Sequence, residues 1–105
     1  MDEKMVKIAF QLISYSGNAR GMAMEAINAA KNKNIEEARK LIQEAKEEIH
    51  KAHEFQITLI QNEADGVKNE ISILLIHSQD HLMTGMTVLD MAEEFVDLYE
   101  IVNNK

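Results

Sequence analysis

The segment that decides the fold covers residues 68–102, KNEISILLIHSQDHLMTGMTVLDMAEEFVDLYEIV, and it is the most apolar part of the chain. Its apolar side chains recur at intervals of three and four residues, which predicts one long helix. Two neighbouring helices of the same chain would leave part of such a surface uncovered, so we predict a homo-oligomer with this helix at its interface. The apolar positions follow two lines, one of Ile71, Leu74, Leu75, Leu82, Met86 and Leu89, and another of Ile73, Ile76 and Met83.

Two further helices with the same apolar periodicity are expected before this segment. The first covers about residues 2–30 and ends where the polar residues 32–34 interrupt the pattern. The second covers about residues 35–64, with Asn34 as its N-cap and Glu37 placed to complete a capping box. Short connections make consecutive helices antiparallel, so the sequence predicts an all-α, three-helix up-down-up bundle.

The third helix is expected at about residues 68–102, after the stop signal Asp65-Gly66. A chain of 105 residues is near the commonest size of one domain, so residues 1–105 are expected to form a single domain. The composition agrees with an all-helical fold, because proline is absent and only four glycines occur.

Charge and cysteine content exclude several classes of function. A formal charge of −7 repels phosphate backbones, so nucleic acid is not an expected partner. The sequence has no cysteine, which removes disulfides, thiolate zinc sites and a thiol nucleophile. The first residues, MDEK, show no basic region followed by an apolar stretch, and no apolar run approaches the ~18 residues of a membrane span. We expect a soluble, cytoplasmic protein with no direct membrane insertion.

The most informative positions for function are His77, Asp80 and His81. They are three and four residues apart, so two imidazoles and one carboxylate share a face of the expected helix. Burial of unpaired ionisable groups costs several kcal/mol, so we expect these groups to be paired, metal-bound or used in chemistry. The same face carries apolar residues that suggest burial, namely Leu74, Val88, Ala92 and Phe95.

The spacing of the two histidines is compatible with three interpretations. A zinc hydrolase is disfavoured, because zinc-protease helices place a glutamate directly after the first histidine, and this chain has Ser78 there. A structural pair at a helix seam stays open. We favour a nucleophilic or acid-base histidine, since a neutral imidazole nitrogen is nucleophilic at pH 7 and can accept a phosphoryl group and pass it on.

Other polar and small residues give weaker signals. His50 is expected to be solvated, His53 to face the seam, and both to pack or form hydrogen bonds rather than react. Gly17 and Gly21 each cost on the order of 1 kcal/mol in a helix relative to alanine, which suggests close approach of another helix or, less often, of a ligand.

Residues 76–84, IHSQDHLMT, resemble the histidine–x–Gln–Asp–His–Leu–Met signature of the IIA component of the lactose/cellobiose (chitobiose) branch of the bacterial sugar phosphotransferase system. Residues 16–20 (SGNAR) and 52–56 (AHEFQ), followed by Thr58, support the resemblance in the family's order. The resemblance covers nearly the whole chain, and the signature shows no departure.

The resemblance implies a trimer in which His77 accepts a phosphoryl group on Nε2, while Gln79 and His81 are candidates to orient that group. It also implies that Asp80 from three subunits shares a divalent cation such as Mg²⁺ near the axis. Three carboxylates brought together repel each other unless a cation or protons neutralise them, and Mg²⁺ prefers oxygen ligands.

The expected partners follow from the same resemblance. The phosphodonor is the phosphohistidine carrier HPr, and the acceptor is the sugar-specific IIB component, which has a cysteine nucleophile in this branch. The protein itself never contacts the sugar, so lactose, cellobiose and chitobiose stay open, with a weak preference for cellobiose or chitobiose. The alternative is a non-catalytic helical assembly module, stabilised by a metal, in which the histidines only fix the oligomer.

Overall fold

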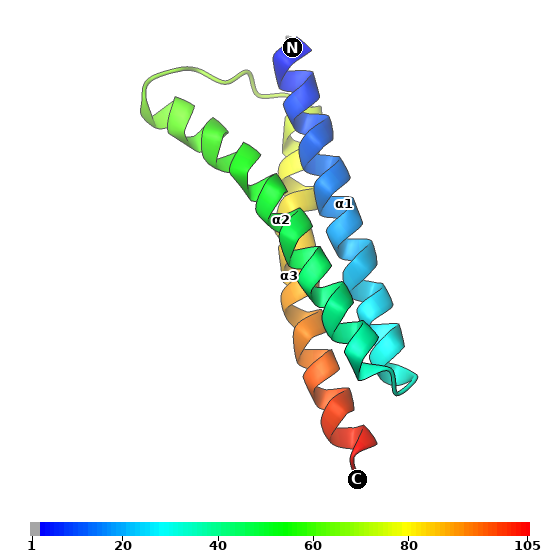
Figure 1. Ribbon diagram of the computed structural model, residues 1–105. Coiled ribbons are helices and arrows are strands. Elements are labelled where there is room, and N and C mark those ends of the chain that lie inside the picture. Colours follow the sequence, from blue (N-terminus) through cyan, green and yellow to red (C-terminus); the bar gives the residue numbers. More distant parts are fainter. Residues whose placement is uncertain (1–2) are drawn as a thin grey trace.

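The computed structural model describes residues 3–105 as three long helices. Helix α1 spans Glu3–Lys31, α2 spans Ile35–Ala64 and α3 spans Ile73–Asn103. Helices α1 and α3 run in the same direction and α2 runs antiparallel to both (Figure 1). The bundle measures 56 × 21 × 18 Å. The predicted all-α, up-down-up arrangement is therefore confirmed, whereas a trimer stays a prediction.

The turn between α1 and α2 and the end of α2 follow the local sequence signals. The Asn34 side chain accepts a hydrogen bond from the backbone N–H of Glu37 at 3.2 Å, as expected for an N-cap. Helix α2 ends at Ala64, and Gly66 follows with φ of +87°, a conformation that glycine adopts at no steric cost. The Asp65-Gly66 stop signal is confirmed.

The start of α3 was predicted wrongly, because the helix begins at Ile73 rather than near residue 68. Ser72 is extended, and its Oγ accepts a hydrogen bond from the backbone N–H of Leu75 at 3.1 Å. A serine in this position satisfies a backbone donor that has no partner within the helix. The apolar periodicity continues upstream of Ser72, but the cap decides where the helix starts.

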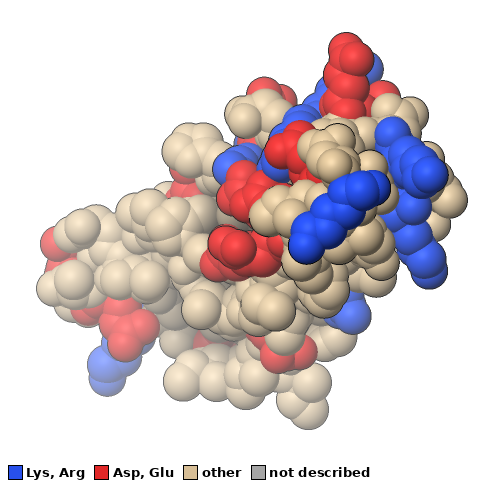
Figure 2. All heavy atoms as spheres, turned by 90° about the horizontal axis from the view of Figure 1, so that it is seen from below, with Lys and Arg blue, Asp and Glu red and all other residues tan. Residues whose placement is uncertain are grey.

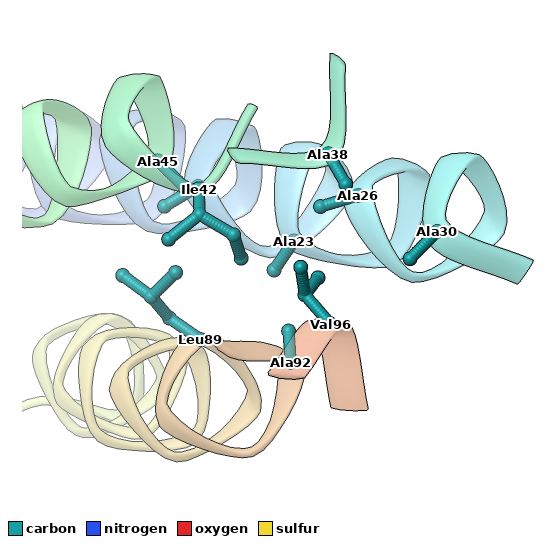
Figure 3. Close-up of a cluster of buried hydrophobic side chains, with 10 residues drawn as sticks. Ala23, Ala26, Ala30, Ala38, Ile42, Ala45, Leu89, Ala92 and Val96 are labelled. Carbon is teal, nitrogen blue, oxygen red and sulfur yellow. The ribbon is translucent and has the colours of Figure 1, made fainter. Parts of the chain in front are cut away.

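The half of the bundle near the α1–α2 turn, which we call the alanine half, is packed around small side chains. Alanine side chains allow the three helices to approach closely (Figure 3). Three ion pairs also join α2 to α3. Arg39 pairs with Asp97 at 2.6 Å and with Glu100 at 3.4 Å, and Lys46 pairs with Glu93 at 2.7 Å. The core of this half comprises Ala19, Ala23, Ala26, Ala30, Ala38, Ile42, Ala45, Leu89, Ala92 and Val96.

The other half, which we call the histidine half, is packed around larger side chains and is more open. The C-terminal part of α2 diverges from α1 and α3 (Figure 1). A cleft of about 580 Å³ lies between this part of α2, the connection after Gly66 and the start of α3, with Gln56, Leu75 and Gln79 in its wall. The core of this half comprises Met5, Ile8, Leu12, Ala52, Leu59, Leu75 and Leu82.

Helix α3 leaves much apolar surface exposed, as the sequence predicts. The exposed fraction reaches 87% at Ile73. Seen from the end where α3 terminates, charged side chains gather toward one side of the molecule and the opposite edge is mostly uncharged (Figure 2). The exposed apolar surface of α3 is the observation on which the expected oligomer depends. The exposed apolar residues on α3 and just before it are Ile71, Ile73, Ile76, Met83, Met91, Phe95, Leu98, Ile101 and Val102.

Candidate functional site

The imidazoles of His77 and His81 lie against each other on the second and third turns of α3. Their Nε2 atoms are 3.1 Å apart, a hydrogen-bond distance at which one ring donates and the other accepts. The ring centroids are 4.5 Å apart, and the planes are nearly perpendicular at 82°. His77 is exposed and His81 is half-buried. The prediction that the two rings share a face is confirmed.

The expectation that this face is the buried stripe of α3 is wrong for the single chain. His77 and Asp80 are exposed, and so is Phe95, although Ala92 is buried. The buried positions beside the two histidines are the residues that directly follow them, Ser78 and Leu82. Two apolar lines compete along α3, and the line that α1 covers is the one that contains three small residues. That line comprises Leu75, Ser78, Leu82, Gly85, Leu89, Ala92 and Val96.

Gly85 and Ser78 explain why α1 covers this line, and the buried position of neither residue was predicted from the sequence. A Cβ on Gly85 would lie 3.3 Å from the backbone carbonyl oxygen of Ser16 on α1, so the two helices approach closely there. The buried Ser78 hydroxyl donates to the carbonyl of Leu75 at 2.6 Å and needs no partner from another helix. The available signal was their spacing, two small residues seven apart between leucines.

Asp80 lies on the exposed side of α3, between two exposed apolar side chains. Ile76 precedes it by four residues and Met83 follows it by three, so both lie on the same face. Among residues 3–105, no three side chains of His, Cys, Asp or Glu lie close enough together to bind a metal. A single chain therefore contributes one carboxylate, that of Asp80, to a metal site at this position.

Gln79 is oriented toward α2 rather than toward His77. Its Oε1 accepts a hydrogen bond from Nε2 of Gln56 at 2.9 Å, and both amides line the cleft. Residues two apart on a helix do not face each other, so Gln79 and His77 of the same chain lie on different sides. The structure brings together His77 with His81, and separately Gln79 with Gln56.

The remaining candidate residues lie apart from this site. His50 is exposed and pairs with Glu54 at 3.0 Å, which agrees with a solvated residue, and His53 is half-buried. Gly17 and Gly21 are exposed, and a Cβ on either would meet no atom within 4 Å. The close helix packing expected at these glycines does not occur in the single chain.

No helix within residues 3–105 is both long enough and apolar enough to cross a membrane.

Comparison with known proteins gives one consistent result. Residues 7–100 match the family described as "PTS system, Lactose/Cellobiose specific IIA subunit", where PTS denotes the phosphotransferase system. The lichenan-specific phosphotransferase enzyme IIA component of Bacillus subtilis is 54% identical over 105 residues, which cover 100% of this chain and 96% of that protein. The lactose-specific EIIA component of Staphylococcus epidermidis is 40% identical and covers 89% of each chain.

Solved structures agree with these sequence matches. The cellobiose-specific enzyme IIA of Bacillus anthracis has a TM-score of 0.96 and 52% identity, and the match covers 100% of this chain and 96% of that one. The IIA(chitobiose) component in its complex with HPr from Escherichia coli has a TM-score of 0.83 and 30% identity, with 97% and 99% covered. The chain thus belongs to the lactose/cellobiose-specific IIA family of the sugar phosphotransferase system.

Proposed function

We propose that this protein is a cytoplasmic phosphocarrier that accepts a phosphoryl group from phospho-HPr on Nε2 of His77 and passes it to a IIB component. The observation that supports this most strongly is the exposed His77 ring, whose Nε2 lies 3.1 Å from Nε2 of His81 within the family's signature stretch. An exposed imidazole is open to in-line approach by a donor protein. The solved complex between a related IIA component and HPr supports the choice of donor.

His81 is well placed to prepare His77 for this transfer. When the Nε2–H of His81 donates to Nε2 of His77, the proton of His77 lies on Nδ1 and the lone pair on its Nε2 accepts that hydrogen bond. The hydrogen bond breaks and frees this lone pair before it attacks phosphorus. The phosphorus–nitrogen bond to the donor breaks as the bond to His77 forms. The same N–H of His81 then lies beside the new phosphoryl oxygens. Transfer of this kind depends on positioning and charge stabilisation.

Gln79 stays a proposed phosphoryl-orienting residue, but its geometry favours action on another copy of the chain. Within its own chain it bonds to Gln56 and lies on a different side of α3 from His77. Because Gln56 occupies the carbonyl oxygen of Gln79, the amide N–H₂ of Gln79 is left to donate to an incoming anion.

We further propose a homotrimer in which Asp80 from three chains shares a divalent cation such as Mg²⁺. Asp80 lies within the exposed apolar strip of α3, so an assembly through this strip brings its carboxylates together. Carboxylate oxygens fit the preference of Mg²⁺ for hard ligands and retained water. The cation would relieve repulsion between the three charges and so stabilise the trimer.

The sugar served by this protein is proposed to be a β-linked glucose disaccharide or oligosaccharide. Two close relatives are named for lichenan and cellobiose, at 54% and 52% identity. Lactose and chitobiose relatives are more distant, at 40% and 33% identity. The proposed phosphocarrier passes on phosphate and does not contact the sugar, so specificity for the sugar belongs to the components that receive the phosphoryl group after it.

The deciding experiment is incubation with phosphoenolpyruvate, enzyme I and HPr, followed by mapping of the labelled peptide. We expect a phosphoprotein that is labile in acid and stable in base, with the label on His77. A label on His81, His50 or His53 would contradict the site. If no label forms while a IIA protein of known activity is labelled in parallel, the non-catalytic assembly module becomes the better interpretation.

A further inference from the structure

We propose that His77 and His81 form a preorganised two-imidazole chelate for a transition-metal cation such as Zn²⁺ or Cu²⁺, and that a bound cation blocks phosphoryl acceptance at His77. The metal site rests on the geometry of the two rings alone. The inhibition of phosphoryl acceptance by the bound cation rests in addition on the proposed function. This cation differs from the one proposed at Asp80 in its ligands, its location and its effect.

The distance between the two Nε2 atoms fits one metal ion. They are 3.1 Å apart, and both belong to residues four apart on one regular helix. With metal–nitrogen bonds of roughly 2.0–2.1 Å, an N–metal–N angle of about 100° spans this separation, between square and tetrahedral geometry. A cation can therefore take the place of the hydrogen bond between the two Nε2 atoms without movement of the backbone.

The rings need only a change of tautomer and a small rotation to bind. In the hydrogen-bonded pair one ring carries its proton on Nε2, and in the chelate both rings carry it on Nδ1, so no proton is gained or lost. His77 is exposed, so its ring is free to rotate until its Nε2 lone pair and the Nε2 lone pair of His81 point at the same metal ion. Water can supply the other ligands on this open surface.

The ligand set selects the class of cation. Neutral imidazole is a good ligand for Zn²⁺, Cu²⁺ and Ni²⁺, whereas Mg²⁺ prefers oxygen ligands. Only two protein ligands are present, since no third His, Cys, Asp or Glu joins them among residues 3–105. Ser78 also stands where a zinc protease has its general base. The site is therefore suited to reversible binding rather than to hydrolysis.

Metal binding and phosphoryl acceptance need the same lone pair. The attack on phosphorus uses the Nε2 lone pair of His77, and a bound cation occupies it. A cell with excess free Zn²⁺ or Cu²⁺ would thus lose phosphoryl flow through this protein reversibly.

Calorimetric titration of the purified protein with Zn²⁺ alone tests the site without any phosphorylation. We expect one equivalent per chain, with affinity at least about tenfold weaker in His77→Ala and in His81→Ala, because the second imidazole binds intramolecularly. The control variant His50→Gln/His53→Gln removes the other two histidines and should keep the full affinity. Equal affinity in wild type and His81→Ala, or loss in the control, would overturn the proposal.

A second measurement uses purified phospho-HPr as donor, so that enzyme I and its own metal requirement are absent. Zn²⁺ at saturation should slow transfer to the wild type at least tenfold, and a chelator should restore it. The residual transfer to His81→Ala should not respond to the same Zn²⁺, which controls for effects on HPr. Transfer that is unaffected by saturating Zn²⁺ disproves the block, whereas a wild type that accepts no phosphate without Zn²⁺ disproves the proposed function instead.

Discussion

The alanine half and the histidine half are built from the same three helices but differ in how closely those helices approach. In the alanine half, seven of the ten core residues are alanine, and Arg39 and Lys46 tie α2 to α3. The histidine half has leucine, isoleucine and methionine in its core, and α2 diverges to open a cleft of about 580 Å³. Small side chains close one half, and larger side chains leave the other open.

Within one continuous bundle, the alanine half therefore contributes mainly to stability and the histidine half holds the residues proposed for chemistry. The ion pair to Asp97 also raises the pKa of Arg39 above its ordinary value, chiefly through the hydrogen bond between them. The titratable pair His77 and His81 lies instead in the open half, at the surface. We therefore expect substitutions in the two halves to affect different measurements.

The largest effect is expected for His77→Ala in the histidine half. Removal of the nucleophile should abolish phosphoryl acceptance from phospho-HPr, because no other group occupies its position. Helicity by circular dichroism should stay unchanged and the free energy of unfolding should shift by less than about 0.5 kcal/mol, since the side chain is exposed. A variant that loses stability along with acceptance would mean that His77 contributes to packing as well as chemistry.

Leu82→Ala should give the largest loss of stability in the histidine half. Leu82 is fully buried next to His81, and truncation of a buried leucine typically lowers the free energy of unfolding by about 2–5 kcal/mol. Urea denaturation measures the change. Ile60→Ala is the matched control, because Ile60 lies in the same half but is 60% exposed, and it should change stability by less than about 0.5 kcal/mol.

Removal of the cation proposed at Asp80 is expected to have an intermediate effect. A ligand that binds only the folded trimer stabilises it, by about 2.7 kcal/mol at a hundredfold excess over its Kd. Wild-type protein should therefore melt at a lower temperature after verified removal of metal. Asp80→Leu replaces a repelling charge with an apolar side chain, so it should stay trimeric in sedimentation and show no response to chelators. Melting of the wild type that is insensitive to metal would exclude Asp80 as an axial ligand.

Ala26→Leu tests whether the alanine half depends on small side chains. Ala26 is fully buried where the three helices meet, so added carbon atoms should lower the free energy of unfolding by about 1–3 kcal/mol. Phosphoryl acceptance at His77 should continue under conditions where the variant is folded. The control is Ala64→Leu at the exposed end of α2, which should leave stability nearly unchanged.

Much of this organisation could be predicted from the sequence, because it depends on periodicity and local caps. The Asn34 cap and the shared face of His77 and His81 are local features of this kind. The line of α3 that is buried could not be predicted, because two apolar lines compete and the choice depends on contact between Gly85 and Ser16, 69 residues apart in the sequence. The Gln56–Gln79 hydrogen bond likewise requires the tertiary arrangement of α2 and α3.

The smallest effect, a gain in stability, is expected for Gly17→Ala. Gly17 is exposed within α1, and a new Cβ there would meet nothing within 4 Å, so the variant should gain about 0.5–1 kcal/mol from helix preference and reduced chain entropy. Gly85→Ala is the matched comparison, because its Cβ would lie 3.3 Å from the Ser16 carbonyl oxygen, and this contact should offset the same gain. Thermal melting of dilute protein measures both. If Gly17→Ala instead lowers stability or slows transfer from HPr, another copy or a partner approaches α1 at this glycine, and the ligand or contact expected from the sequence lies between molecules.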